Sequence, residues 1–185
     1  LGIKQPLQRL VILTNGGGPS VVTADIIDLS HSLSLVEFSA ETKEALRKVL
    51  PPMAAVGNPV DIIGDALASR YADTLKIICA AKDVDGIILI LTPQMMTEVE
   101  ATAKLVTEFR QQKPILPVFI GGPTVETGLI YFKQNNLVNF TFPKDAIEAL
   151  DNLACGAKKS ERVITESDTP APTPLLSLLN FAEMF

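Results

Sequence analysis

The sequence predicts an α/β protein: a doubly wound, mostly parallel five-stranded sheet between two layers of helices. Three observations predict this class. Short apolar runs rich in Val, Ile and Leu alternate along the chain with segments of helical period. The clearest run, residues 86–91, is apolar almost throughout, as strands buried on both faces are. Glycine-rich or polar loops follow several of these runs, where a strand would turn into a helix.

The composition limits the kind of protein this is. The chain has 185 residues, of which 47% are hydrophobic, so we expect one sizeable folded domain with an appendage. No apolar run approaches the ~20 residues that span a bilayer, which predicts a soluble protein without a membrane partner. The net charge is −5, and no basic cluster exceeds Lys158, Lys159 and the nearby Arg162, which argues against a nucleic-acid partner. Cys79 and Cys155 lie far apart in apolar helical patterns, which predicts buried free thiols and a cytoplasmic location.

The segment at residues 9–31 has the pattern of a strand, a glycine loop and a helix, and the rest of the prediction depends on it. Leu10–Leu13 is short, apolar and β-branched enough to be a buried strand. Three glycines follow in Asn15–Ser20, where the backbone can adopt angles that other residues avoid. The next apolar residues recur at helical spacing and are expected to face the core: Val21, Val22, Ala24, Ile26, Ile27 and Leu29. The opposite, solvated face would carry Thr23, Asp25 and Asp28.

The rest of the chain alternates in the same way. Apolar runs predict further strands at residues 35–38, 86–91, 115–120 and 140–142. Apolar residues at helical spacing predict helices at about residues 41–50, 69–82, 97–112, 125–135 and 144–157. Ser39 is expected to cap the first of these helices and Thr97 the third. Residues 53–66 show no sustained period and are rich in Gly, Pro, Asn and Asp, so we expect a long functional loop there.

The composition changes near residue 160. Residues 164–174, ITESDTPAPTP, are polar and proline-rich, which is typical of a linker. Residues 175–185 return to an apolar, helix-compatible pattern. We therefore expect a domain at residues 1–160. Residues 161–185 would hold a linker and the start of a segment that belongs to another domain, so the chain is expected to be a piece of something longer.

The flavodoxin-like strand order 2-1-3-4-5 is the simplest arrangement for this alternation, and ligands of such sheets bind beyond the carboxyl ends of the strands. The strand-to-helix loops would meet at that rim. The glycine loop contributes the candidate phosphate ligands, which are Asn15, Gly16, Gly17, Gly18, Pro19 and Ser20. The candidate contacts from the other loops are Asn58, Asp61, Thr92, Gln94, Gly121 and Gly122.

The glycine loop has the make-up of an anion site. A glycine loop that opens a helix presents unpaired N–H groups and the positive end of the helix dipole to an anion. The loop lacks the Lys-Ser/Thr ending of a P-loop, and its contiguous glycines do not match the dinucleotide fingerprint GxGxxG. Binding of a phosphate and a tight structural turn therefore remain as two interpretations, with the phosphate of a flavin as a third.

Other polar residues have simpler interpretations. The only histidine, His31, lies too far along the helix to reach a ligand at the glycine loop, so we expect it at the surface. Asp61 and Asp65 are candidates for metal or substrate binding, although turn formation is the commoner role of such residues. Met95 and Met96 are expected to pack. The sequence shows no metal-ligand cluster and no nucleophile–base pair, so we expect neither a metal site nor a catalytic residue in this chain.

Five segments carry a resemblance to a known family: TNGGGPSVVTAD, LPPMAAVGNPVDIIGDA, LILTPQMMTE, FIGG and FPKDAIEAL. In this order they resemble one subdomain of the NDP-forming acyl-CoA synthetases. These are the ADP-forming acetate–CoA ligases and their relatives, in the succinyl-CoA synthetase superfamily. The resemblance covers about residues 9–158. The chain resembles the CoA-ligase-type domain that lies third along the α-part, after the CoA-binding domain and the domain with the catalytic histidine.

The resemblance implies a flavodoxin-like domain of an enzyme that makes acyl-CoA from acid, CoA and ATP, or runs the reverse. In that family a phosphohistidine carries the phosphoryl group towards an ATP-grasp domain, and two helix N-termini steady it. The matching helix here begins at residues 17–20. The implied partners are the CoA-binding, histidine-bearing and ATP-grasp domains. They would bind CoA, ATP or ADP, and Mg, so that this chain holds no cofactor and is inactive alone.

Two other hypotheses stay open on the sequence. Related chains fuse this domain set to an acetyltransferase, where the domain could sense acyl-CoA or nucleotide without turnover. An independent flavin-binding flavodoxin is the weaker alternative. The sequence indicates neither the acyl group nor the nucleotide preference.

Overall fold

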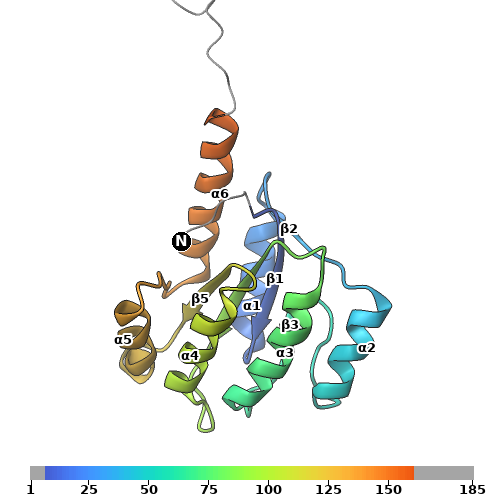
Figure 1. The fold of residues 1–185 in the computed structure, drawn as a ribbon, viewed down its shortest axis with the longest axis vertical. Helices are drawn as coiled ribbons and strands as arrows, with labels where there is room; N and C mark the ends of the chain where they lie inside the picture. Colours follow the sequence, from blue (N-terminus) through green and yellow to red (C-terminus); the bar gives the residue numbers. More distant parts are fainter. Residues whose placement is uncertain (1–6, 161–185) are drawn as a thin grey trace, which may run out of the picture.

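Five parallel strands form one sheet with helices on both faces (Figure 1). The structure is a computed structural model that describes residues 7–160, apart from the side chains of residues 154–160. The strands are β1 (Arg9–Thr14), β2 (Ser34–Leu35), β3 (Val60–Asp61), β4 (Gly86–Leu91) and β5 (Ile115–Phe119). The helices are α1 (Gly17–Asp28), α2 (Ala40–Val49), α3 (Ala68–Ala80), α4 (Val99–Phe109), α5 (Glu126–Gln134) and α6 (Pro143–Ser160), with a 3-10 turn η1 (Gly122–Val125) before α5. The predicted three-layer α/β class is confirmed.

The predicted linker at residues 161–185 lies outside the described residues, and the division of the chain near residue 160 stays a prediction. Within residues 7–160, no helix combines the length and the apolar character that crossing a membrane requires.

Alternate residues of the central strands face opposite helix layers. Val11 and Leu13 of β1 are fully buried on the side of α2, α3, α4 and α5, whereas Leu10 and Ile12 pack on the side of α1 and α6. β4 is buried along its whole length, as its apolar sequence predicts. In Figure 1, α2, α3 and α4 lie in front of the sheet and α1 lies behind it.

The strands pair in the order β2-β1-β4-β5, with β3 also paired to β1. The first four expected strands therefore take their predicted order. The expected fifth strand is reduced to a single parallel bridge between Phe140 and Val118. Phe140 N–H donates to Pro117 O (2.9 Å), and Phe119 N–H donates to Phe140 O (3.0 Å). Pro143 opens α6 soon afterwards, so the chain leaves the sheet before a longer ladder forms.

One edge of β1 is completed by a side chain rather than by a strand. β2 pairs with the beginning of β1, and β3 pairs with its end. Between them, Asn58 Nδ2 donates to the carbonyls of Leu10 (2.8 Å) and Val36 (3.1 Å), and Asn58 Oδ1 accepts a hydrogen bond from Ile12 N–H (2.9 Å). The amide thus satisfies backbone groups that would otherwise face a gap in the ladder.

This arrangement corrects two sequence predictions. The strand predicted at residues 35–38 is confined to Ser34–Leu35, because the Asn58 amide occupies the place beside β1 that a longer strand would need. Residues 53–66, predicted as an irregular loop, contain the short strand β3. Directly after it, Ile62 N–H donates to Thr14 O (2.8 Å), which ties this segment to the carboxyl end of β1.

α1 buries a different face from the predicted one. Its buried residues are Ser20, Thr23 and Ile27. Three residues predicted to face the core are exposed instead, namely Val21 (59%), Val22 (54%) and Leu29 (81%). Thr23 is accommodated in the interior because its Oγ1 donates to Pro19 O (2.6 Å), which satisfies the hydroxyl. The apolar spacing was therefore a wrong guide to the rotation of this helix.

Of the two predicted helix caps, one is confirmed. Ser39 Oγ accepts a hydrogen bond from Thr42 N–H (3.2 Å) at the start of α2. The prediction for Thr97 is wrong, because Glu98 occupies the N-cap position of α4. The hydroxyl of Thr97 instead accepts a hydrogen bond from Gln94 N–H (2.9 Å) inside the preceding loop.

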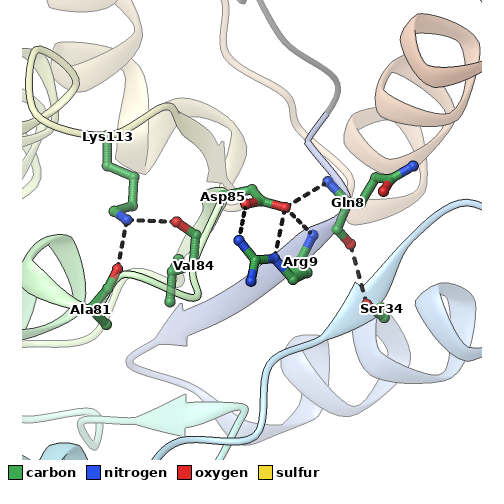
Figure 2. A network of polar contacts seen from close by, with 7 residues as sticks. All are labelled: Gln8, Arg9, Ser34, Ala81, Val84, Asp85 and Lys113. Carbon is green, nitrogen blue, oxygen red and sulfur yellow. Dashed lines mark hydrogen bonds and ion pairs between the residues drawn. The ribbon is translucent and has the colours of Figure 1, made fainter.

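The carboxylate of Asp85 joins the amino ends of β1 and β4 (Figure 2). Asp85 Oδ2 accepts hydrogen bonds from the backbone N–H groups of Gln8 (3.3 Å) and Arg9 (2.8 Å), and Oδ1 pairs with the Arg9 guanidinium (2.8 Å). Nearby, Lys113 Nζ donates to the carbonyl of Ala81 (2.9 Å), just after α3. These contacts stabilise the end of the sheet opposite the glycine loop.

Asp85→Asn should make stability less sensitive to acid. Partial burial opposes ionisation, but the hydrogen bonds from Arg9 and Gln8 lower the pKa of Asp85 below its ordinary value. Such a carboxylate stabilises the fold above its unfolded pKa of about 4, and this stabilisation is lost as the pH falls through the lower, folded pKa. We expect Asp85→Asn to lower Tm by on the order of 3 °C near pH 7 and much less near pH 2. Thermal unfolding at both pH values is the measurement; an equal loss at both would contradict the expectation.

Candidate functional site

Strand-to-helix loops meet beyond the carboxyl ends of β1 and β4. Asn15, which follows β1 and is only 1% exposed, joins the two loops. Its Nδ2 donates to Thr92 O (2.8 Å), and its Oδ1 accepts hydrogen bonds from Thr92 N–H (2.8 Å) and Thr92 Oγ1 (3.1 Å). A longer contact joins Asn15 Nδ2 to Thr97 Oγ1 (3.4 Å). The loops at residues 15–20 and 92–97 therefore form one unit.

Two glycines permit close packing at this rim. A Cβ atom on Gly16 would lie 2.6 Å from Thr92 Oγ1, and one on Gly121 would lie 2.6 Å from Pro93 Cγ. Both distances are too short for a side chain to be added without movement of the neighbouring loop. The loops after β1, β4 and β5 thus converge, as the predicted topology requires.

The start of α1 leaves two N–H groups without an acceptor. Four N–H groups at a helix start lack an intrahelical partner. Here Gly16 N–H donates to Thr14 Oγ1 (3.0 Å), and Pro19 has no N–H group. No acceptor among the described residues bonds to the N–H groups of Gly17 and Gly18, and the N-cap offers no side-chain bond. Two neutral donors and the positive end of the helix dipole therefore meet at one point of the rim.

Two other helix starts are satisfied by side chains of the chain itself. Ser39 caps α2, and Glu98 Oε2 accepts a hydrogen bond from Ala68 N–H (2.9 Å) at the start of α3. At the start of α1, Thr14 Oγ1 accepts from Gly16 N–H, but within the described residues no acceptor bonds to the N–H groups of Gly17 and Gly18. The starts of α4 and α5 likewise have no side-chain cap, so the missing cap alone does not distinguish α1.

Several predicted ligand side chains are directed elsewhere. The Ser20 hydroxyl is buried and donates to Gly17 O (2.8 Å), while the Asn15 amide holds the Thr92 loop. Asn58 lies at the edge of β1, as described above. Of the remaining candidates, Thr92 is half-buried and bonded to Asn15, whereas Gln94, Gly121 and Gly122 are exposed on the rim. At the glycine loop, the structure presents backbone N–H groups rather than side chains to a ligand.

Asp61 lies beside the same helix start. A Cβ atom on Gly17 would be 3.2 Å from Asp61 Oδ2. The other oxygen, Oδ1, accepts a hydrogen bond from Ile63 N–H (2.9 Å), the turn contact that the sequence suggested. Burial, and then the charge of Asp61, raise the pKa of Tyr71, whose hydroxyl donates to Ile90 O (3.2 Å) beneath the rim. A carboxylate therefore lies next to Gly17 at the start of α1.

The comparisons with known proteins cover the same region. Residues 10–160 match the family model described as the Ligase-CoA domain. The chain belongs to the Ligase-CoA domain family. It is 36% identical over 165 residues to the acetate–CoA ligase [ADP-forming] II subunit alpha of Pyrococcus furiosus, which is 83% of this chain and 35% of that protein. It is 33% identical over 160 residues to the acetate–CoA ligase [ADP-forming] I of Archaeoglobus fulgidus, which is 86% of this chain and 23% of that protein.

A solved structure is similar to most of this chain. The crystal structure of PH0766 from Pyrococcus horikoshii OT3 matches with a TM-score of 0.75 and 32% sequence identity, over 85% of this chain and 38% of that chain. This Ligase-CoA domain thus spans between about a quarter and two fifths of the length of these relatives.

The sequence did not predict the role of Thr14 in this Ligase-CoA domain, and it predicted Asp61 as a rim contact without its place beside Gly17. In the sequence, Thr14 looks like one more residue of the first strand. In the structure, its Oγ1 accepts a hydrogen bond from Gly16 N–H and donates one to Gly16 O (2.9 Å), which fixes the turn between β1 and α1. Asp61 was a candidate rim contact, but its position beside Gly17 depends on the pairing of β3 with β1. Neither feature leaves a periodic signal in the sequence.

The remaining sequence predictions concern Met95, Met96, His31, Cys79 and metal binding. Met95 is fully exposed and Met96 is 51% exposed, so the prediction that they pack within this chain is wrong. The loop that carries them is held by the hydroxyl of Thr97, which leaves both side chains outside the core. His31 is exposed, as predicted. Cys79 is a free, partly buried thiol whose pKa is raised by burial. In the part of the Ligase-CoA domain that the structure describes, no group of three or more His, Cys, Asp or Glu residues could hold a metal ion.

Proposed function

We propose that this Ligase-CoA domain is part of an ADP-forming acyl-CoA ligase, and that the start of α1 receives the phosphoryl group that the reaction transfers. The observation that carries this proposal is the pair of unbonded N–H groups of Gly17 and Gly18 on the rim. Relatives named as ADP-forming acetate–CoA ligases support the reaction class. The reaction would convert an acid, CoA and ATP into acyl-CoA, ADP and phosphate, and it would be reversible.

Neutral N–H donors suit a reversible transfer. They hydrogen-bond a dianionic phosphoryl group, and the helix dipole adds about 0.3–1 kcal/mol to its binding. They do not protonate the group, and they do not compete for it as nucleophiles. The group can therefore leave as readily as it arrives, which a carrier step requires.

The other parts of the reaction belong to other domains in this proposal. The relatives are longer than this chain, which leaves room for CoA-binding, histidine-bearing and ATP-grasp domains. We assign the phosphohistidine to the histidine-bearing domain, and CoA, ATP or ADP, and Mg to these partner domains. Val21 and Val22, exposed near the start of α1, offer an apolar surface that such a partner could cover. This chain would form one wall of a shared site in the cytoplasm, without a catalytic residue of its own.

An activity assay on the full-length protein that contains this chain tests the proposal. We expect acyl-CoA to form from CoA, ATP and at least one short-chain acid, with ADP and phosphate released in equal amounts. The 185-residue chain alone should form none. Release of AMP and pyrophosphate, or no acyl-CoA with any acid of a broad panel, would overturn the assignment.

A further inference from the structure

The outward side of α1 carries a mixture of apolar and acidic side chains. Ser20, Thr23 and Ile27 face the interior, so the opposite side of the helix faces solvent. The exposed side chains there are Val21, Val22, Asp25, Asp28 and Leu29. They recur at intervals of three or four residues and so form one line, which we call the outer stripe of α1. At 1.5 Å per residue, its apolar ends at Val22 and Leu29 are about 10 Å apart.

The two aspartates of the outer stripe have no cation beside them. α1 contains no lysine or arginine, and among the side chains that the structure describes neither Asp25 nor Asp28 forms an ion pair. On α4, by contrast, Glu100 pairs with Lys104 one turn away (2.7 Å). Asp28 is the last residue of α1, where the negative end of the helix dipole opposes a carboxylate. Neither charge therefore has a stabilising role within the described part of the domain.

The exposed apolar surface continues from α1 to α6, which packs beside it behind the sheet. Ser30 Oγ donates to Asp151 Oδ1 (2.7 Å) and joins the end of α1 to α6. Leu29 precedes Ser30 and is 81% exposed, and Leu153 follows Asp151 by two residues and is 43% exposed. In Figure 1, α6 continues past the end of the sheet, so the sheet does not cover its last turns. Exposed leucines thus lie near the contact between the two helices.

A further domain of a longer protein is the occupant that fits this surface. The chain spans 35% and 23% of the length of two relatives, so most of such a protein lies outside it. The described residues end with α6, and a segment that follows would leave the domain on the side where α1 and α6 lie. A second copy of this chain fits poorly. Asp25 is at the centre of the outer stripe, and a two-fold axis there would bring the aspartates of both copies together.

We propose that the outer stripe of α1 is the docking surface for another domain of the longer protein, and that this domain presents a lysine or arginine between apolar side chains. The cation would pair with Asp25 and Asp28, and the apolar side chains would cover Val22 and Leu29. Apolar contacts around an ion pair exclude water, which strengthens the pair. The inference concerns the back of the sheet rather than the glycine loop, and it does not depend on the reaction that the domain serves.

Cysteine labelling in the full-length protein tests the inference. Leu29→Cys and Met53→Cys are a matched pair, because Leu29 is 81% and Met53 86% exposed in this domain. Each variant is treated with iodoacetamide in native buffer and in urea, and mass spectrometry identifies the labelled peptide. Docking should slow native labelling of Leu29→Cys at least about tenfold relative to urea, whereas Met53→Cys should stay within about twofold. A Leu29→Cys variant that labels as fast in native buffer as in urea overturns the inference.

Charge reversal tests the chemistry of the partner domain. Asp25→Lys, added to Leu29→Cys, should speed labelling about tenfold or more, because it repels the proposed cation. Glu108→Lys reverses an exposed charge on α4, in front of the sheet, and should leave the protection unchanged. Full protection in a folded Asp25→Lys variant overturns the assigned partner. Protection that disappears on dilution also overturns it, since that result indicates a second copy.

These outcomes are separate from those of the activity assay. A protected outer stripe in a full-length protein that forms no acyl-CoA would leave this inference standing and overturn the proposed function. An accessible outer stripe in an active ligase would overturn this inference alone.

Discussion

Gly18→Asp in the full-length enzyme is expected to lower phosphoryl transfer about 100-fold or more. The new carboxylate would stand at the start of α1, where open space surrounds the Cβ position of Gly18, so it fits without a clash. There it would take up the free N–H donors and repel the phosphoryl group; the loss of a single preorganised donor typically costs about 100- to 1,000-fold. The fold should be unharmed, because an acidic residue in the first turn stabilises a helix by about 0.3–1 kcal/mol.

Gly18→Asn is the matched control for this variant. Asparagine has nearly the same size and shape as aspartate but carries no charge, so its transfer rate should remain much closer to that of the wild type. The measurement is the rate of phosphohistidine formation from labelled ATP, with Tm recorded for each variant. Equal rates for Gly18→Asp and the wild type, at unchanged Tm, would refute the assigned role of the helix start.

The largest effect on stability is expected from Asn58→Asp. The asparagine amide donates to two backbone carbonyls and accepts from Ile12 N–H at a buried strand. Aspartate can still accept, but it cannot donate to Leu10 O and Val36 O, and it places a negative charge against both oxygens. An unsatisfied buried polar group costs about 1–3 kcal/mol, so the free energy of unfolding should fall by about 3 kcal/mol or more.

Urea unfolding of the two proteins measures this loss, and Asn136→Asp serves as the control. Asn136 is exposed with a φ of +52°, a conformation that both asparagine and aspartate tolerate. The same chemical change there should shift stability by less than about 0.5 kcal/mol. A loss of similar size at both positions would show that the Asn58 amide does not complete the edge of β1.

The sheet order could be predicted because it depends on signals that lie within the chain. Uniformly apolar runs mark β1, β4 and β5, and helices of suitable length separate them. The edge of the sheet could not be predicted in the same way. A side-chain amide at Asn58 replaces part of a strand there, and hydrogen bonding by one asparagine has no period that a sequence reveals.

The candidate site could be predicted only in part. The glycine loop is the expected feature, and its backbone lies on the expected rim. The side chains of Asn15 and Ser20 turn out to stabilise the loop, because both are buried and must be hydrogen-bonded within the protein. The neighbourhood of Asp61 and Gly17 arises from strand pairing between distant segments, which local pattern does not encode.

The most direct test is the structure of the full-length enzyme in its phosphorylated state. The central claim predicts that phosphoryl oxygens lie within about 3.2 Å of the amide nitrogens of Gly17 and Gly18, at hydrogen-bonding geometry. The claim would be contradicted if, in every trapped state of the phosphorylated enzyme, another group caps those two amides and the phosphoryl group is bound elsewhere.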